Sequence, residues 1–252
     1  MMGYADFARF YDLLTCNVDY RKLSRQYAGI LAERGVSSGR LLDLACGSGN
    51  LAAELQKAGF EVVGADLSEE MLTAAALKSN SIQWIRADMT DLPFKNEFDG
   101  VVCGLDSINH LPDLNAIAAA FQGIYSSLKN GGVFAADLNT PYKHREILAD
   151  NAFNFDYDGL FCAWQNELSE NDPLNRVDMF LDFFEEQQDG SYIRYQDSLS
   201  EIAPEPSQIE QLMRDSGFVD VKLFDCPSGK SVGKHSEKIF VAGVKAVRSG
   251  QV

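Results

Sequence analysis

The sequence has few basic residues for its length. Its 252 residues contain 22 Lys and Arg against 37 Asp and Glu, which gives a formal net charge of −15. Such a surface repels nucleic acid unless a local basic patch overrides it, and the densest basic group, at 143–145, is too short to do so. The composition therefore argues against a nucleic-acid substrate and favours a small neutral or cationic one.

Long apolar runs and paired cysteines are also missing. No apolar stretch can cross a bilayer, and residues 1–6 lack a basic segment followed by an apolar one, so we expect a cytoplasmic protein without membrane association. No C-x-x-C pair occurs, and no histidine stands at zinc-ligand spacing. Five scattered cysteines therefore predict free thiols and no bound metal. The cysteines are Cys16, Cys46, Cys103, Cys162 and Cys226.

Strand and helix patterns alternate along the middle of the chain. Strands are predicted at 40–45, 61–65, 82–86, 98–103 and 133–138, with helices at 51–58, 69–78 and 114–128 between them. Ser68 is expected to cap the second of these helices. Such alternation predicts an α/β fold, a parallel sheet with helices on both faces. A helix over 207–216 and strands over 218–224 and 238–244 complete it.

The segment 151–203 departs from this alternation. It is rich in aromatic and acidic residues, with turn sequences at 157–159, 171–173 and 188–190. We predict an antiparallel β-meander of three or four strands, inserted because the sheet pattern resumes after it. The predicted units are an N-terminal helical segment (1–36), a core (37–150 and 204–247) and the insertion (151–203).

A glycine loop follows the first predicted strand. Gly47 and Gly49 fit a loose G-x-G-x-x-A pattern, and Asp66 ends the next strand, where an acid can bind ribose hydroxyls. NAD-binding folds share both features. Asp43 distinguishes NAD, which carries phosphates, from a cationic cofactor. Repulsion between a carboxylate and a phosphate charge ~4 Å away costs about 4 kcal/mol at a dielectric near 20. Asp43 favours a cationic cofactor, unless it only caps the helix after the loop.

The stretch 43–49 resembles motif I of class I S-adenosylmethionine (SAM)-dependent methyltransferases, with Ala45 at the first glycine position. Asp66, Met71 and the pair Asp88–Met89 match later motifs in order. The resemblance covers roughly 37–140 and points to the small-molecule branch that includes sugar-amine and glycine N-methyltransferases. It implies a Rossmann-like seven-stranded sheet with the meander over the active site.

The resemblance also implies a cofactor site. SAM is the expected cofactor, S-adenosylhomocysteine the expected product, and the helical segment 1–36 the expected lid. The expected contacts are Tyr11, Asp43, Ala45, Cys46, Gly47, Gly49, Asp66, Leu67, Met71, Asp88, Met89, Cys103, Gly104 and Leu105. Taken alone, Asp66 could enter a helix, Asp88 could form a turn, and the cysteines could be packing residues.

The loop 105–111 carries the candidate catalytic residues, His110 and Asp106. Ligands of open α/β sheets bind beyond the carboxyl ends of the strands, where this loop lies. Histidine titrates near neutral pH, so His110 can accept a proton from an amine or hydroxyl, or else it holds the loop in place. Candidate substrate residues are Tyr4, Asn109, Asn139, Trp164, Phe180 and Tyr195, whereas His144 and His235 are expected at the surface.

These features predict an in-line transfer of methyl from SAM to N or O of a small acceptor, by a monomer or a homodimer. Two alternatives stay open: methylation of a protein, or SAM binding without turnover. An NAD-dependent reductase is a further alternative, which Asp43 opposes.

Overall fold

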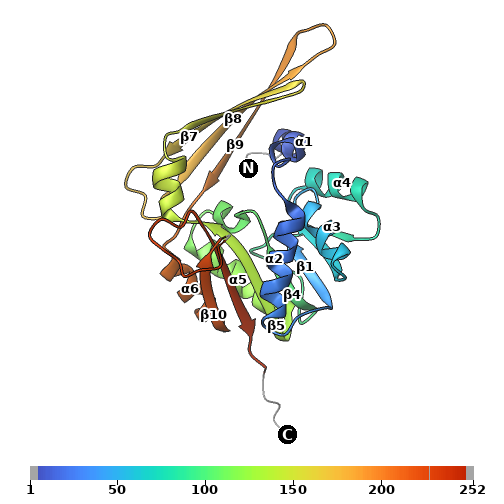
Figure 1. Ribbon diagram of the computed structural model, residues 1–252, viewed down its shortest axis with the longest axis vertical. Helices are drawn as coiled ribbons and strands as arrows, with labels where there is room; N and C mark the ends of the chain where they lie inside the picture. Colours follow the sequence, from blue (N-terminus) through green and yellow to red (C-terminus); the bar gives the residue numbers. More distant parts are fainter. Residues whose placement is uncertain (1–4, 227, 248–252) are drawn as a thin grey trace.

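A seven-stranded mixed sheet forms the centre of the computed structural model, which describes residues 5–226 and 228–247 (Figure 1). Its strands lie in the order β10 (Phe218–Asp225), β11 (Lys238–Lys245), β5 (Leu128–Asn139), β4 (Phe98–Cys103), β1 (Arg40–Leu44), β2 (Glu61–Asp66) and β3 (Gln83–Arg86). The strands from β1 to β5 are parallel, and β11 runs antiparallel to both β5 and β10. The predicted strand-and-helix alternation is confirmed.

Helices cover both faces of this sheet. On one face lie α2 (Tyr20–Ala32) and α3 (Asn50–Lys57), and on the other α5 (Leu114–Ser127) and α6 (Pro206–Asp215). Successive strand residues point to opposite faces, so Leu41 packs in the α2–α3 cluster and Leu42 in the α5–α6 cluster. The helix α4 (Glu69–Lys78) begins where predicted, because the Ser68 hydroxyl accepts a hydrogen bond from the Met71 N–H at 3.2 Å.

The predicted meander is a separate four-stranded antiparallel sheet. Its strands are β6 (Ala152–Tyr157), β7 (Leu160–Leu168), β8 (Val177–Glu186) and β9 (Tyr192–Glu201), and all three predicted turns fall between them. Alternate residues of β8 from Val177 to Phe183 are buried and form a cluster with α1 (Ala5–Leu14). Figure 1 shows the meander extending from one end of the core, with α1 near its inner side.

The predicted lid is shorter than residues 1–36. Helix α1, for which we keep the name lid, contacts both α4 and β9. Helix α2 instead belongs to the core, because Tyr27, Ile30 and Leu31 are buried against the sheet. Two short helical segments, η1 (Ser107–His110) and η2 (Lys143–Leu148), were not predicted. Within the described residues, no helix combines the length and apolarity needed to cross a membrane.

Candidate active site

A pocket opens at the carboxyl ends of β1 and β4, the edge where open α/β sheets bind ligands. The space that protein atoms leave unfilled here, including the part open to solvent, is about 290 Å³. Six of the predicted cofactor residues line it: Tyr11, Asp43, Ala45, Cys46, Gly104 and Leu105. The lid helix, the glycine loop and the segment after β4 therefore meet where the sequence placed a cofactor.

Asp43 is buried at the floor of this pocket, with 1% of its surface exposed. Its carboxylate accepts a hydrogen bond from the Ala52 N–H in the first turn of α3, yet Oδ2 has no hydrogen-bond partner among the described residues. Burial, and then the charge of Asp66, raises the pKa of Asp43 to about 8. An unpartnered buried carboxylate oxygen is costly, so a cationic ligand group would fit here.

The glycine loop brings bare backbone to the pocket. Gly47 and Gly49 have φ of +52° and +80°, and a Cβ on Gly49 would lie 2.5 Å from the Trp84 ring. Ala45, which stands where the family motif has glycine, also adopts a left-handed φ of +55°. The loop conformation therefore fits the motif even at the position where the sequence departs from it.

Asp66 holds the glycine loop against β2. Its Oδ2 accepts from the Gly47 N–H at 2.8 Å and its Oδ1 from the Ser68 N–H at 2.9 Å. Burial raises the pKa of Asp66 despite these bonds. These bonds show that Asp66 shapes the loop. Each oxygen keeps a second lone pair that could accept from a ribose hydroxyl, so ribose binding by Asp66 stays a prediction.

Helix α1 is tied to the glycine loop by a residue that the sequence did not single out. Asp12 Oδ1 accepts from Ser48 Oγ at 2.6 Å, and Asp12 Oδ2 pairs with Lys78 Nζ of α4 at 2.6 Å. Beside it, a side chain at Gly47 would come within 3.4 Å of the Tyr11 ring. Burial, followed by the nearby Tyr20 hydroxyl, raises the pKa of Tyr11. Tyr11 therefore stands over the loop as a neutral phenol.

The other side of α1 is bound to the meander. Arg9 Nη2 donates to both carboxylate oxygens of Glu185 at 2.7 Å, and Arg9 Nη1 donates to Tyr195 Oη at 2.8 Å. The ring of the next residue, Phe10, stacks on Phe183 with centroids 4.8 Å apart. The lid is thus held at both the pocket and the meander.

The segment after β4 has an unusual backbone. Leu105 and Asp106 both adopt left-handed φ, +54° and +53°, which costs free energy for residues other than glycine. Buried Asp137 at the end of β5 compensates, because its carboxylate accepts from the N–H groups of Leu105 (2.8 Å) and Asp106 (3.2 Å). Tyr27 Oη donates to the same carboxylate at 2.5 Å.

Lys238 of β11 neutralises this group of acids. Its Nζ lies 2.9 Å from Asp137 Oδ2 and 3.2 Å from Asp106 Oδ2. Burial opposes ionisation of Asp106, but Lys238 and then Lys143 outweigh it and lower the pKa of Asp106 to about 2. Asp106 is therefore an ion-paired carboxylate, and its catalytic role stays a prediction.

Comparisons with known proteins identify the family. A protein-family model described as a methyltransferase domain matches residues 41–132. A Bacillus subtilis protein named as a methyltransferase, YqeM, is 32% identical over 250 residues, covering 97% of this chain and 98% of that protein. A SAM-dependent methyltransferase of known structure from Clostridium acetobutylicum is 32% identical with a TM-score of 0.84, covering 96% of this chain and 99% of that one. The chain belongs to the SAM-dependent methyltransferases.

A third relative matches part of this chain. It is the dTDP-3-amino-3,4,6-trideoxy-alpha-D-glucopyranose N,N-dimethyltransferase of Streptomyces venezuelae, which is 30% identical over 151 residues. The match covers 59% of this chain and 62% of that enzyme. SAM as the cofactor, predicted from the Asp43 loop, is confirmed by the family, whereas the contact made by each residue stays a prediction.

Several predicted cofactor residues of the methyltransferase lie away from the pocket lining. Met71 is buried in the cluster that α1 forms with the meander, and Cys103 is fully buried with burial raising its pKa. Asp88 is exposed and forms a turn, its Oδ1 accepting from both the N–H and the hydroxyl of Thr90. Leu67 is 54% exposed, and Met89 packs at the edge of the core. Met71 and Cys103 are therefore packed inside the fold, and their contact with the cofactor stays a prediction.

Two predicted substrate residues, Asn109 and Asn139, are structural instead. Asn109 is fully buried, and its amide donates to the carbonyls of Asn139 and Ile202 and accepts from the Asn139 N–H. The Asn139 side chain donates to Glu201 and accepts from Lys143. Asn109 donates both of its amide N–H groups inside the fold and Asn139 is 3% exposed, so the protein itself holds both side chains.

The predicted meander contacts differ from one another. Phe180 is 44% exposed and lies on the face of β8 opposite to the buried residues that meet α1, so it points away from the site, contrary to the prediction. Trp164 lies on the inner face and donates to Asn166 Oδ1 at 2.6 Å. Tyr195 holds the lid through Arg9. Tyr4 lies outside the described residues.

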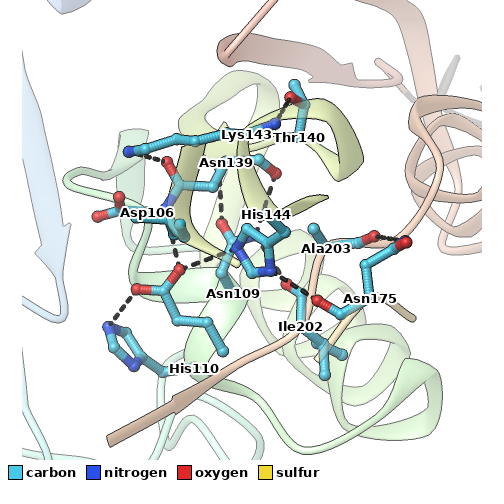
Figure 2. Close-up of polar contacts among 12 residues, drawn as sticks. Asp106, Asn109, His110, Asn139, Thr140, Lys143, His144, Asn175, Ile202 and Ala203 are labelled. Carbon is cyan, nitrogen blue, oxygen red and sulfur yellow. Dashed lines mark hydrogen bonds and ion pairs between the residues drawn. The ribbon is translucent and has the colours of Figure 1, made fainter. Parts of the chain in front are cut away.

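His144 was expected at the surface but is fully buried, because η2 turns it inward beneath the end of β9. There it contacts Glu201, which also faces His110 of η1 (Figure 2). His235 is exposed, as predicted. No sequence signal pointed to Glu201, because η1, η2 and β9 are far apart along the chain.

Asp12→Ala should make the lid easier to open. Loss of the bonds to Ser48 and Lys78 is expected to raise the dissociation rate of SAM about tenfold, which corresponds to about 1.4 kcal/mol. Chasing radiolabelled SAM with an excess of unlabelled SAM measures that rate. Asp156→Asn, an exposed acid on β6, is the matched control and should leave it unchanged. An equal rate in Asp12→Ala and wild type would show that the tether does not retain the cofactor.

Proposed function

We propose that this methyltransferase transfers a methyl group to the amino group of a small molecule. The observation that carries the proposal is the environment of His110. Two carboxylates face it, Asp106 and Glu201, and ion pairing or hydrogen bonding lowers the pKa of each although burial opposes this. The Glu201 carboxylate beside His110 favours an ammonium acceptor over a neutral alcohol. The N,N-dimethyltransferase of an amino sugar among the relatives supports this choice.

The position of His110 supports a role in proton removal. Leu105 lines the pocket, and it is followed by Asp106 and then by η1, whose last residue is His110. Asp106 thus links the pocket with His110. A cytoplasmic location and an acceptor that is not a nucleic acid belong to the same proposal and rest on the charge and cysteine patterns of the sequence.

In the proposed reaction, SAM supplies an electrophilic methyl group on a positively charged sulfur. Asp43 and the glycine loop hold the cofactor, while α1 and the meander exclude water. His110 takes a proton from the acceptor ammonium, and the freed nitrogen lone pair forms the bond to the methyl carbon. The C–S bond breaks, its electrons stay on sulfur, and S-adenosylhomocysteine is released. Alignment of the reacting atoms accounts for roughly 7–11 kcal/mol of the barrier reduction in such reactions.

Transfer of label from methyl-labelled SAM to matched acceptors tests the proposal. Amino sugars and their nucleotide conjugates are offered beside analogues in which a hydroxyl replaces the amine. We expect label in the amines and at least tenfold less in the hydroxyl analogues. Equal labelling of both series, or labelling confined to the alcohols, would contradict N-methylation while leaving the methyltransferase family intact.

His110→Gln should then lower kcat at neutral pH by about 100-fold, the lower end of the range for general-base catalysis. The loss should shrink above pH 9, where more of the acceptor amine arrives unprotonated. SAM affinity, measured by calorimetry, should stay within twofold of wild type. A loss of kcat that is the same at every pH would exclude proton removal by His110.

A further inference from the structure

Glu201 joins two histidines that come from different parts of the chain (Figure 2). It ends β9, and 7% of its side chain is exposed. Its Oε2 lies 3.2 Å from His144 Nε2 and accepts from Asn139 Nδ2 at 2.9 Å, while its Oε1 lies 3.6 Å from His110 Nε2. Each carboxylate oxygen therefore faces one imidazole.

The contacts of His144 fix its protons. Its Nδ1 lies 2.7 Å from the carbonyl oxygen of Asn175, and a carbonyl can only accept, so this nitrogen carries hydrogen. The 3.2 Å contact with Glu201 then requires one more proton between His144 Nε2 and the carboxylate. Burial opposes ionisation of Glu201, but the hydrogen bond from His144 and the charge of His110 lower its pKa. The hydrogen bond from His144 therefore favours the ionised form of Glu201.

His110 presents one nitrogen for chemistry. Its Nδ1 is buried, whereas 26% of its side chain is exposed, so Nε2 is the nitrogen that can meet a proton donor. The other charged groups nearby are already engaged. Asp106 pairs with Lys238, which also pairs with Asp137, and Lys143 donates to Asn139. Glu201 is thus the carboxylate positioned to stabilise a positive charge on His110.

We propose that Glu201 is a positioning residue that orients His110 and stabilises its protonated form, and that His144 keeps the Glu201 carboxylate ionised and in place. The inference rests on the proposed function of His110. When Nε2 takes the proton of the acceptor ammonium, the imidazolium that forms lies 3.6 Å from Glu201 Oε1, and the charge of this carboxylate stabilises it. The acceptor loses this proton and His110 gains it, while the proton between His144 and Glu201 stays in place.

Titration of the histidines by ¹⁵N-detected NMR tests the coupling without any acceptor. The chain has three histidines, so their signals can be assigned by single replacement, and exposed His235 is an internal control. Glu201→Gln should move the midpoint of the His110 titration down by about one pH unit or more. His235 should not move, and Glu167→Gln, an exposed acid on β7, should leave all three histidines unchanged. An unmoved His110 midpoint would overturn the proposal.

Kinetics separate a positioning role from direct binding of the acceptor. Glu201→Gln should lower kcat about 10- to 100-fold at pH 7 with KM within threefold, and recover most of the loss at pH 9. Glu201→Asp, which keeps the charge, should restore part of kcat, and it serves if the Gln variant does not fold. A raised KM with kcat and the His110 titration unchanged would mean that Glu201 binds the acceptor, against the proposal. A moved titration with an unchanged pH–rate profile would instead reject His110 as the base.

Discussion

Replacing Asp43 with Asn is expected to weaken SAM binding about 100-fold and to make the free protein more stable. Asp43 Oδ2 is buried in the pocket without a hydrogen-bond partner among the described residues, at the place where a cationic group of the cofactor would fit. Removing one partner of a buried charge pair costs about 2–5 kcal/mol. The amide keeps an oxygen for the Ala52 N–H, so α3 stays capped.

The gain in stability follows from the raised pKa of Asp43. The carboxyl binds its proton with a pKa of about 8 in the folded chain and of about 3.9 in the unfolded chain. Between these values the folded state holds more protons, so the free energy of unfolding falls as pH rises from about 4 to 8. At pH 7 the free energy of unfolding of the wild type is therefore several kcal/mol lower than at pH 4 because of this group. The Asn variant has no such group, so it does not undergo this loss.

Two measurements check the Asp43 prediction. Calorimetry at pH 7 gives the SAM affinity, and urea unfolding at pH 5 and pH 7.5 gives the stability of both proteins without ligand. The stability advantage of Asp43→Asn should be larger at pH 7.5. Asp91→Asn, at an exposed acid, should change neither quantity. A variant that keeps its SAM affinity would remove Asp43 from the cofactor site.

Asp137→Asn is expected to destabilise the protein by about 3–5 kcal/mol, the usual cost of breaking a buried ion pair. The buried carboxylate accepts hydrogen bonds from Tyr27 and from the left-handed turn at Leu105 and Asp106, and it pairs with Lys238. The amide has one oxygen where the carboxylate had two, and it supplies no charge for the lysine. Because this turn lines the pocket, the variant should bind SAM more weakly as well as being less stable.

A double-mutant cycle isolates the ion pair. Lys238→Met alone should also destabilise, and the double variant should lose at least 1 kcal/mol less than the sum of the two single losses. The exposed pair of Glu54 and Lys57, 2.6 Å apart, is the control, with a coupling below about 1 kcal/mol. Additive losses at Asp137 and Lys238 would show that the lysine does not stabilise the turn.

Local signals in the sequence predicted the fold well. The cap at Ser68 placed α4 correctly, and the turn sequences of the insertion fell between its four strands. Hydrogen bonds between neighbouring residues and the alternation of apolar side chains determine such features, so a sequence displays them. The glycine loop belongs to the same class, because its chemistry is contained in seven consecutive residues.

The parts of the site that were missed depend on contacts between distant segments. Asp12 meets Ser48 across 36 residues, and Glu201 meets His144 across 57. Asn109 and Asn139 have the polarity of substrate contacts, but their partners are backbone groups that the fold brings beside them. The prediction put Phe180 on the wrong face of the meander. Alternation along a strand shows which residues share a face, but it does not show which of the two faces meets the lid.

The two tryptophans give this enzyme two optical reporters, one in each sheet. Trp84 is in the core sheet, with its ring packed against the bare backbone of Gly49 and Gly64, whereas Trp164 is on the inner face of the meander. The Trp164→Phe variant keeps Trp84, so its fluorescence reports on the cofactor loop. The Trp84→Phe variant keeps Trp164, so its fluorescence reports on the meander around the lid. Recorded in parallel after rapid mixing, the two signals would time cofactor arrival and lid movement separately, without an added dye.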